Sequence, residues 1–236
     1  MIQQYQFMAS YLQKLSDGLG QRTAPVQPRF KPEVAVCSVG KETANGDRCI
    51  WFEGTGGRYY VLLCDGMGTG LGAAQEARVA ADMLKRLLSS GFPPEHALRS
   101  LNSLCALRSR AGAVTVDLAE IRLDTGNTTL YKWGAMPSYI LSRLGTEKIG
   151  TTTPPPGLSM TEGRETVERL SLRRGEVLVL LSDGVDGEVV RREIPLHTQL
   201  PPEELAAEIL ERGIKSMDDD ATVVVIRLTA GTLPPS

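Results

Sequence analysis

Two apolar segments of the chain each end in an aspartate that a glycine follows. Residues 59–64 lead into Asp65, and residues 177–182 lead into Asp183. Short apolar runs bounded by glycine are typical of buried strands, so each aspartate is expected where a strand reaches the surface. A single Asp-Gly pair is most often only a turn. Two copies, each behind a strongly apolar strand, favour one shared carboxylate site.

Two further acidic positions extend this pattern. Asp47 follows the turn-forming pair Asn45-Gly46, and Asp219 lies in the acidic triplet 218–220, which on composition alone reads as a solvated loop. Carboxylates without histidine or cysteine suit the hard cations Mg²⁺ and Mn²⁺. One carboxylate bridging two such ions, about 3.5–4 Å apart, makes a site that activates water and clamps a phosphoryl group. The residues alone therefore predict a divalent-metal phosphohydrolase.

The composition excludes several classes of function. The 236 residues are 42% hydrophobic and 23% charged, as in an ordinary globular protein, and the net charge of −2 favours neither nucleic acid nor an anionic membrane as partner. No apolar run approaches the roughly 18 residues of a membrane span, and the N-terminus lacks a signal peptide. The four cysteines form no C-x-x-C pair, which indicates reduced thiols. We expect a cytoplasmic protein without direct membrane contact in this chain, or the cytosolic domain of a membrane-anchored parent.

The order of expected elements indicates the fold class. It is not a β-α-β alternation, so an α+β fold is expected, with antiparallel sheets covered by segregated helices. Nine or ten strands are more than one twisted sheet holds comfortably, which predicts two packed sheets, a β-sandwich. Helices are expected over 2–17, 71–90, 94–107 and 201–213, and strands over 33–39, 48–53, 58–64, 113–123, 128–133, 138–143, 165–170, 175–182 and 221–228.

The N-terminal helix has two interpretations. Its apolar stripe, which includes Leu12 and Leu15, either docks on the domain or forms a linker or dimerisation helix continuous with something upstream. We divide the chain into a linker or regulatory helix (1–22), a proline-containing linker (23–32), one domain (33–230) and a tail (231–236).

Four motifs occur in a fixed order along the chain. They are Asn-Gly-Asp (45–47), Cys-Asp-Gly-Met-Gly-Thr-Gly (64–70), Leu-Ser-Asp-Gly (181–184) and Asp-Asp-Ala-Thr-Val-Val-Val (219–225). With the flanking Gly-Ala-Met-Pro-Ser (134–138), they resemble the metal-dependent PPM serine/threonine phosphatases, and more closely the bacterial branch typified by the stage II sporulation E phosphatase. The resemblance covers about residues 33–229. It implies a β-sandwich between helical layers, αββα, which agrees with the elements expected above.

The resemblance also implies a set of metal ligands. Asp65 is expected to bridge two Mn²⁺ or Mg²⁺ ions, with the carbonyl of Gly66 as a further ligand. Asp183 and Asp219 are expected to complete the coordination of one ion. Asp47 is expected to bind the other ion or its waters. In this family, metal-bound hydroxide attacks a phosphoserine or phosphothreonine directly, so Asp65, Asp183 and Asp219 are the expected catalytic residues.

The choice within the acidic triplet depends on Thr222. The family pattern is Asp-x-x-Thr, and this frame selects Asp219 rather than Asp220. A phosphate-binding arginine of the eukaryotic members has no clear match here, and Arg48 is a candidate only because it follows Asp47.

The resemblance further implies a substrate and a mode of regulation. The substrate would be a phosphorylated anti-sigma-factor antagonist, a small STAS-domain protein, in bacterial sigma-factor regulation during sporulation. The helices over 71–107 and 2–17 correspond to an activating switch and dimer surface, and Gly68 and Gly70 precede that switch. The alternative is a non-catalytic PPM-like module that binds or regulates. A haloacid-dehalogenase-type site is excluded, because no second aspartate lies two residues after Asp65.

Overall fold

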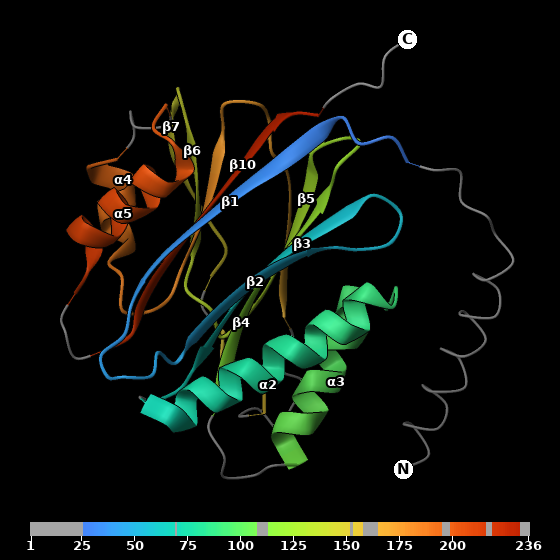
Figure 1. Ribbon diagram of the computed structural model, residues 1–236, viewed down its shortest axis with the longest axis vertical. Helices are drawn as coiled ribbons and strands as arrows, with labels where there is room; N and C mark the ends of the chain where they lie inside the picture. The colour runs from blue at the N-terminus through green and yellow to red at the C-terminus, as the bar shows by residue number, and fades with distance from the viewer. Residues whose placement is uncertain are drawn as a thin grey trace, which may run out of the picture.

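Two five-stranded antiparallel sheets face each other in the computed structural model of the protein (Figure 1). The structure describes residues 26–68, 70–107, 113–151, 153–157, 165–194, 199–215 and 219–231. Helices cover the outer side of each sheet, which gives the layers αββα (Figure 1). The α+β sandwich predicted from the order of elements is therefore confirmed. No helix within the described ranges is long and apolar enough to cross a membrane.

The first sheet has the strand order β1-β10-β9-β6-β7. Its outer face packs against two helices, where valines of the sheet such as Val179 and Val225 meet Leu205 and Ile209. The elements are β1 (Phe30–Val39), β10 (Ala221–Ala230), β9 (Val177–Leu181), β6 (Ser138–Ser142), β7 (Gly145–Ile149), α4 (Gly187–Arg192) and α5 (Pro202–Gly213).

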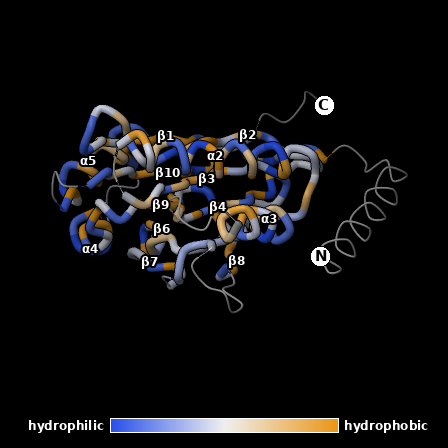
Figure 2. Tube along the Cα trace, turned by 90° about the horizontal axis from the view of Figure 1, so that it is seen from below, coloured by the Kyte–Doolittle hydropathy of each residue, from blue (hydrophilic) through white to orange (hydrophobic). Residues whose placement is uncertain are grey.

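The second sheet has the strand order β2-β3-β4-β5-β8. Its outer face packs against the other two helices, where Leu62 and Val116 meet Leu84 and Leu98. Each of these helices carries hydrophobic and hydrophilic residues, as expected for a helix that covers a sheet (Figure 2). The elements are β2 (Asp47–Glu53), β3 (Arg58–Gly66), β4 (Val114–Arg122), β5 (Asn127–Trp133), β8 (Thr166–Ser171), α2 (Gly70–Ser89) and α3 (Pro94–Leu107).

Strand β3 shows how the fold directs a carboxylate between the sheets. Successive side chains of a strand point to opposite faces. Val61 and Leu63 point towards the other sheet, where they pack with Leu180 and Val224 in the core between the sheets. Asp65 continues the row of Val61 and Leu63, so it lies at the end of this apolar layer.

Two strands differ from those expected from the sequence, β1 in where it begins and β7 in being present at all. Strand β1 begins at Phe30 rather than Glu33, so residues 30–32 belong to the strand and not to a linker. Pro32 is tolerated because β1 is an edge strand, which pairs only with β10. Strand β7 was not expected, since its partly exposed sequence Gly-Thr-Glu-Lys-Ile has no clear apolar alternation.

Helix α4 was also not expected. It has only six residues, too few to show a helical apolar period, and it begins after Asp186, whose side chain accepts a hydrogen bond from the Glu188 amide at 3.0 Å. The helix expected over 2–17, with Leu12 and Leu15, lies outside the described residues.

Candidate metal centre

Asp47 and Asp65 lie directly opposite each other on neighbouring strands. Asp47 opens β2, Asp65 comes near the end of β3, and the two are partners in the antiparallel register. Directly opposite side chains on one face of a sheet are about 4.5–5.5 Å apart at Cβ, and like charges there repel. This sheet therefore carries a pair of carboxylates whose repulsion calls for a cation.

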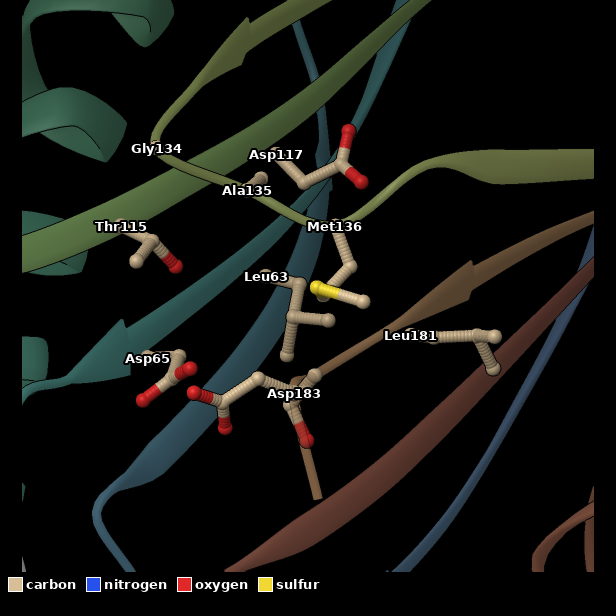
Figure 3. A pocket seen from close by; sticks show the side chains of 10 residues that line it. Leu63, Asp65, Thr115, Asp117, Gly134, Ala135, Met136, Leu181 and Asp183 are labelled. Atoms are coloured by element: carbon tan, nitrogen blue, oxygen red, sulfur yellow. The ribbon is translucent and has the colours of Figure 1, made fainter. Parts of the chain in front are cut away.

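The other sheet contributes Asp183 and Asp219. Asp183 follows β9 and Asp219 precedes β10, and these strands are adjacent and antiparallel. The strand ends are joined by hydrogen bonds from the Ser182 amide to the Thr222 carbonyl (3.0 Å) and from the Thr222 amide to Ser182 Oγ (2.8 Å). The side chain of Asp183 points towards that of Asp65 across the gap between the sheets (Figure 3).

Two cavities open between these carboxylates. The inner one has a volume of about 140 Å³ (Figure 3) and the outer one about 200 Å³, and both are lined by Asp65 and Asp183. Asp219 lines the outer cavity only, while Asp47 lies beside Asp65 and lines neither. The sequence-predicted aspartates thus gather at one end of the sandwich, where two strands from each sheet begin or end.

Burial and repulsion from neighbouring carboxylates raise the pKa values of Asp47, Asp65 and Asp183. Burial raises the pKa of Asp65 to about 8, with further increments from Asp47, Asp183 and Asp219. Burial likewise raises the pKa of Asp47 to about 6. The pKa of Asp183 is raised by burial and by Asp219, and Lys215 opposes this rise. Without a positive charge nearby, Asp65 would not be fully ionised at neutral pH.

The donor set fits a divalent cation. Both carboxylate oxygens of Asp47 are buried and have no hydrogen-bond partner. Thr222 and Ser182 lie close enough to moderate the pKa of Asp47, yet neither forms a hydrogen bond of good geometry with it. An unpaired buried carboxylate costs several kcal/mol, which a metal ion would offset.

The carboxylates approach one another in pairs rather than as one tight cage. Among the described residues, no three Asp, Glu, His or Cys side chains converge closely enough, as they stand, to enclose an ion. Mg²⁺ characteristically uses one or two carboxylates and keeps several waters, and backbone carbonyls such as that of Gly66 are also suitable donors. Facing pairs of carboxylates therefore suit Mg²⁺ or Mn²⁺ better than a fully protein-enclosed ion.

Asp220 has a different environment from Asp219. Its carboxylate is buried and accepts hydrogen bonds from the amides of Lys41 (2.8 Å) and Gly46 (2.7 Å). The Gly46 carbonyl in turn accepts from the Gly66 amide at 3.1 Å. Asp220 therefore fixes the backbone that leads into Asp47, whereas Asp219 faces the cavity.

Glycines bring helix α2 against the site. A Cβ on Gly66 would lie 2.2 Å from the carbonyl oxygen of Ala73 in α2, so only glycine allows this approach. Gly68 (φ +97°), which follows β3, and Gly70 (φ +74°), the first residue of α2, adopt left-handed conformations, and Gly68 lines the outer cavity. The two glycines that precede the expected switch thus lie where the segment that carries Asp65 joins α2.

Several cavity residues were missed by the sequence analysis. Thr115 and Asp117 line the inner cavity from β4, and the signal was two polar side chains on the inward face of an apolar strand. Lys215 donates to the Asp183 carbonyl at 2.6 Å and brings a positive charge close to the site. Arg48 follows Asp47 in β2, so its side chain lies on the opposite face of the sheet.

Solved structures, among them a PP2C phosphatase domain, share the fold of this chain. The PP2C phosphatase domain of SpoIIE from Bacillus subtilis, solved with a fragment of its regulatory domain, is similar with a TM-score of 0.77 and 25% identity. The similarity covers 88% of this chain and 66% of that one. RsbX in complex with magnesium has a TM-score of 0.67 and 15% identity over 86% of this chain and 100% of that one, a likeness of fold alone.

The sequence also shows to which family of proteins the chain belongs. The pattern of the family Stage II sporulation protein E (SpoIIE) matches residues 55–229, and the chain belongs to that family. The stage II sporulation protein E of Priestia megaterium is 30% identical over an alignment of 213 residues, and the match covers 84% of this chain and 36% of that protein. The chain thus spans about a third of the length of this relative, and the resemblance seen in the motifs is confirmed.

Proposed function

We propose that the domain is a metal-dependent protein phosphatase that hydrolyses phosphoserine or phosphothreonine. The observation that carries this proposal is the facing pair Asp47, whose carboxylate oxygens are buried without a partner, and Asp65, which Asp183 and Asp219 oppose across a cavity. The PP2C fold and the SpoIIE family membership support the same class.

Each carboxylate has a defined place in the proposed centre. Asp65 would be shared by two ions, Mn²⁺ or Mg²⁺. Asp183 and Asp219 would hold one of them, and Asp47 with the Gly66 carbonyl would hold the other. Bound ions would supply the charge that makes water a nucleophile at neutral pH and that offsets the charge of the phosphoryl group.

The remaining cavity residues would orient the substrate. The outer cavity, of about 200 Å³, is lined by Thr115, Gly134 and Pro155 besides the carboxylates, and it suits a phosphorylated side chain better than a large ligand. Lys215, which donates to the Asp183 carbonyl, would add positive charge at the side where the phosphate approaches.

The substrate proposed is a phosphorylated STAS-type anti-sigma-factor antagonist. The SpoIIE family membership supports it, since the family is named for a stage of sporulation. We also propose a cytoplasmic location and a homodimer formed through the N-terminal helix or through α2 and α3.

The test is metal-dependent release of phosphate from a phosphoserine STAS protein and from a phosphoserine peptide. Wild type is expected to be active with Mn²⁺ or Mg²⁺ and inactive after chelation. The rate of phosphate release by Asp65→Asn is expected to be at least about 100-fold lower than that of wild type. Even changes to residues that only contact the metal ligands lower metal affinity or activity 10–100-fold.

The matched control is Asp124→Asn, which changes a carboxylate paired with Arg122 on the surface and is expected to stay within about twofold of wild type. Equal rates for wild type and Asp65→Asn, or rates that ignore chelation, would contradict the proposal. A protein that binds Mn²⁺ but releases phosphate from neither substrate would be the non-catalytic module.

A further inference from the structure

Three polar side chains form a closed cluster inside the sandwich. Asp117, Lys132 and Ser138 are each at most 1% exposed, and Lys132 is among the largest fully buried side chains of the described residues. Lys132 Nζ donates to the Asp117 carboxylate and, at 2.7 Å, to Ser138 Oγ, which donates to Asp117 Oδ2 at 3.1 Å. We call these three residues the buried triad.

The buried triad connects the two sheets. Asp117 in β4 and Lys132 in β5 are partners within one sheet, while Ser138 opens β6 in the other. The chain crosses between the sheets over residues 134–137, and three of these residues line the inner cavity. The hydroxyl of Ser138 is therefore a hydrogen-bonded link between the sheets, located where the cavity wall is built.

Each end of the buried triad lies one strand away from a predicted metal ligand. Strand β4 pairs with β3, with Asp117 opposite Leu63 and Thr115 opposite Asp65. Strand β6 pairs with β9, which leads directly into Asp183. A change in how the triad holds β4 against β6 would therefore change the distance between Asp65 and Asp183.

Stability alone does not account for a buried ion pair at this position. Desolvation lowers the pKa of Lys132, and Asp117 opposes this. Oδ1 of Asp117 is buried without a hydrogen-bond partner, so the cluster is not fully satisfied. Well-packed apolar side chains of similar volume stabilise a core at least as well as a buried ion pair. The position of the Asp117–Lys132 ion pair beside the cavity therefore indicates a role in the geometry of the site.

We propose that the buried triad of Asp117, Lys132 and Ser138 is a positioning element that sets the spacing of the two sheets at the metal centre. The proposal rests on the proposed function, because the spacing matters only if carboxylates of both sheets bind common ions. Although Asp117 also lines the inner cavity, the three side chains hydrogen-bond to one another. They act through the positions of Asp65 and Asp183.

The test is direct Mn²⁺ binding by isothermal titration, with the melting temperature measured on the same samples. Ser138→Ala removes the link between the sheets and leaves the ion pair within its own sheet. It is expected to weaken Mn²⁺ binding about tenfold, the lower end of the effect of outer-shell changes. Ser138→Thr keeps a hydroxyl and is expected to retain most of the affinity.

The control is Thr128→Val. This change removes another fully buried hydroxyl, which is on β5 but bonds to the Gly126 carbonyl near the end of the strand remote from the cavity. It is expected to lower the melting temperature and to leave Mn²⁺ affinity within about twofold of wild type.

A double variant, Asp117→Leu with Lys132→Met, replaces the ion pair by apolar side chains. It is expected to fold, because such replacements are often neutral for stability. It is also expected to bind Mn²⁺ at least as weakly as Ser138→Ala.

The outcomes separate the two proposals. A wild type that binds no Mn²⁺ overturns the proposed function. A wild type that binds Mn²⁺, together with folded triad variants of unchanged affinity, overturns the role of the buried triad and leaves the proposed function standing. If Ser138→Ala does not fold, the affinity of the double variant decides.

Discussion

The stability of the fold depends on the protonation of the paired aspartates Asp47 and Asp65. The pKa of Asp65 is about 8 and that of Asp47 about 6, each raised above the value of an unfolded chain, near 4. A raised carboxyl pKa means that the folded state binds more protons than the unfolded state between the two values. Stability therefore falls as pH rises from about 4 to 8 when no cation is present.

We predict that the chelated protein loses stability between pH 5 and 8 and that Mn²⁺ removes most of this loss. Asp65→Asn abolishes the charge, so the chelated variant is expected to exceed chelated wild type at pH 8 by at least about 1.4 kcal/mol, the equivalent of one pKa unit. Denaturant unfolding at several pH values measures this difference. Asp124→Asn should keep the wild-type slope, and a chelated wild type with a flat profile would contradict the assignment.

At the scale of elements, the connection from β3 to α2 joins the carboxylates to a whole helix. Gly66 contacts the backbone of Ala73 so closely that an added Cβ would lie 2.2 Å from its carbonyl oxygen. Backbone cannot give way as a flexible side chain can, so any displacement of α2 is transmitted to the segment that carries Asp65. This contact is what a role of α2 in the activating switch expected from the sequence would require.

We predict that Gly66→Ala displaces α2, lowers stability by about 1–3 kcal/mol as overpacking does, and weakens Mn²⁺ binding. Gly72→Ala is the matched control, because a Cβ there meets nothing within 4 Å and the residue lies inside α2. It is expected to stabilise the protein by up to about 1 kcal/mol with unchanged metal binding. Thermal unfolding and Mn²⁺ titration of both variants measure the contrast, and equal behaviour would argue against the coupling.

The strands and helices with strong periodic patterns could be predicted from the sequence, and short or exposed elements could not. Strand β3 carries a run of buried residues that ends in Asp65, so its path and its carboxylate were evident. Helix α4 has six residues and depends on the Asp186 cap, which gives no period to detect. The buried triad was also not predicted, because nothing local distinguishes a lysine that pairs with Asp117 across strands from an exposed one.

At the scale of the whole molecule, the site is assembled from both sheets, and each sheet has its own helical cover. Asp47 and Asp65 come from the sheet that α2 and α3 cover, and Asp183 and Asp219 flank strands of the sheet that α4 and α5 cover. A movement of one sheet relative to the other would therefore change the distances between the carboxylates of the metal centre. Partners that bind the helical layers could regulate the site without entering the cavity.

We predict that removal of residues 1–20, which include Leu12 and Leu15, reduces turnover by about fivefold or more, a usual size of regulatory coupling. The truncated chain is also expected to sediment as a monomer where the full chain is a dimer. Removal of residues 231–236 is the control and should change neither property. Sedimentation velocity and phosphate release measure the two effects, and an unchanged truncated chain would contradict the regulatory role expected for residues 1–20.

The position of β10 in its sheet has a consequence for the order of events during synthesis. This strand is the last in the described part of the chain, yet it lies between β1 and β9 and pairs with both. Asp219 is synthesised only just before this strand. So is Asp220, whose carboxylate accepts a hydrogen bond from the Gly46 amide. A growing chain on the ribosome therefore cannot close the centre until residues 219–230 have emerged. A partly made domain would carry Asp47, Asp65 and Asp183 but would lack the fourth aspartate.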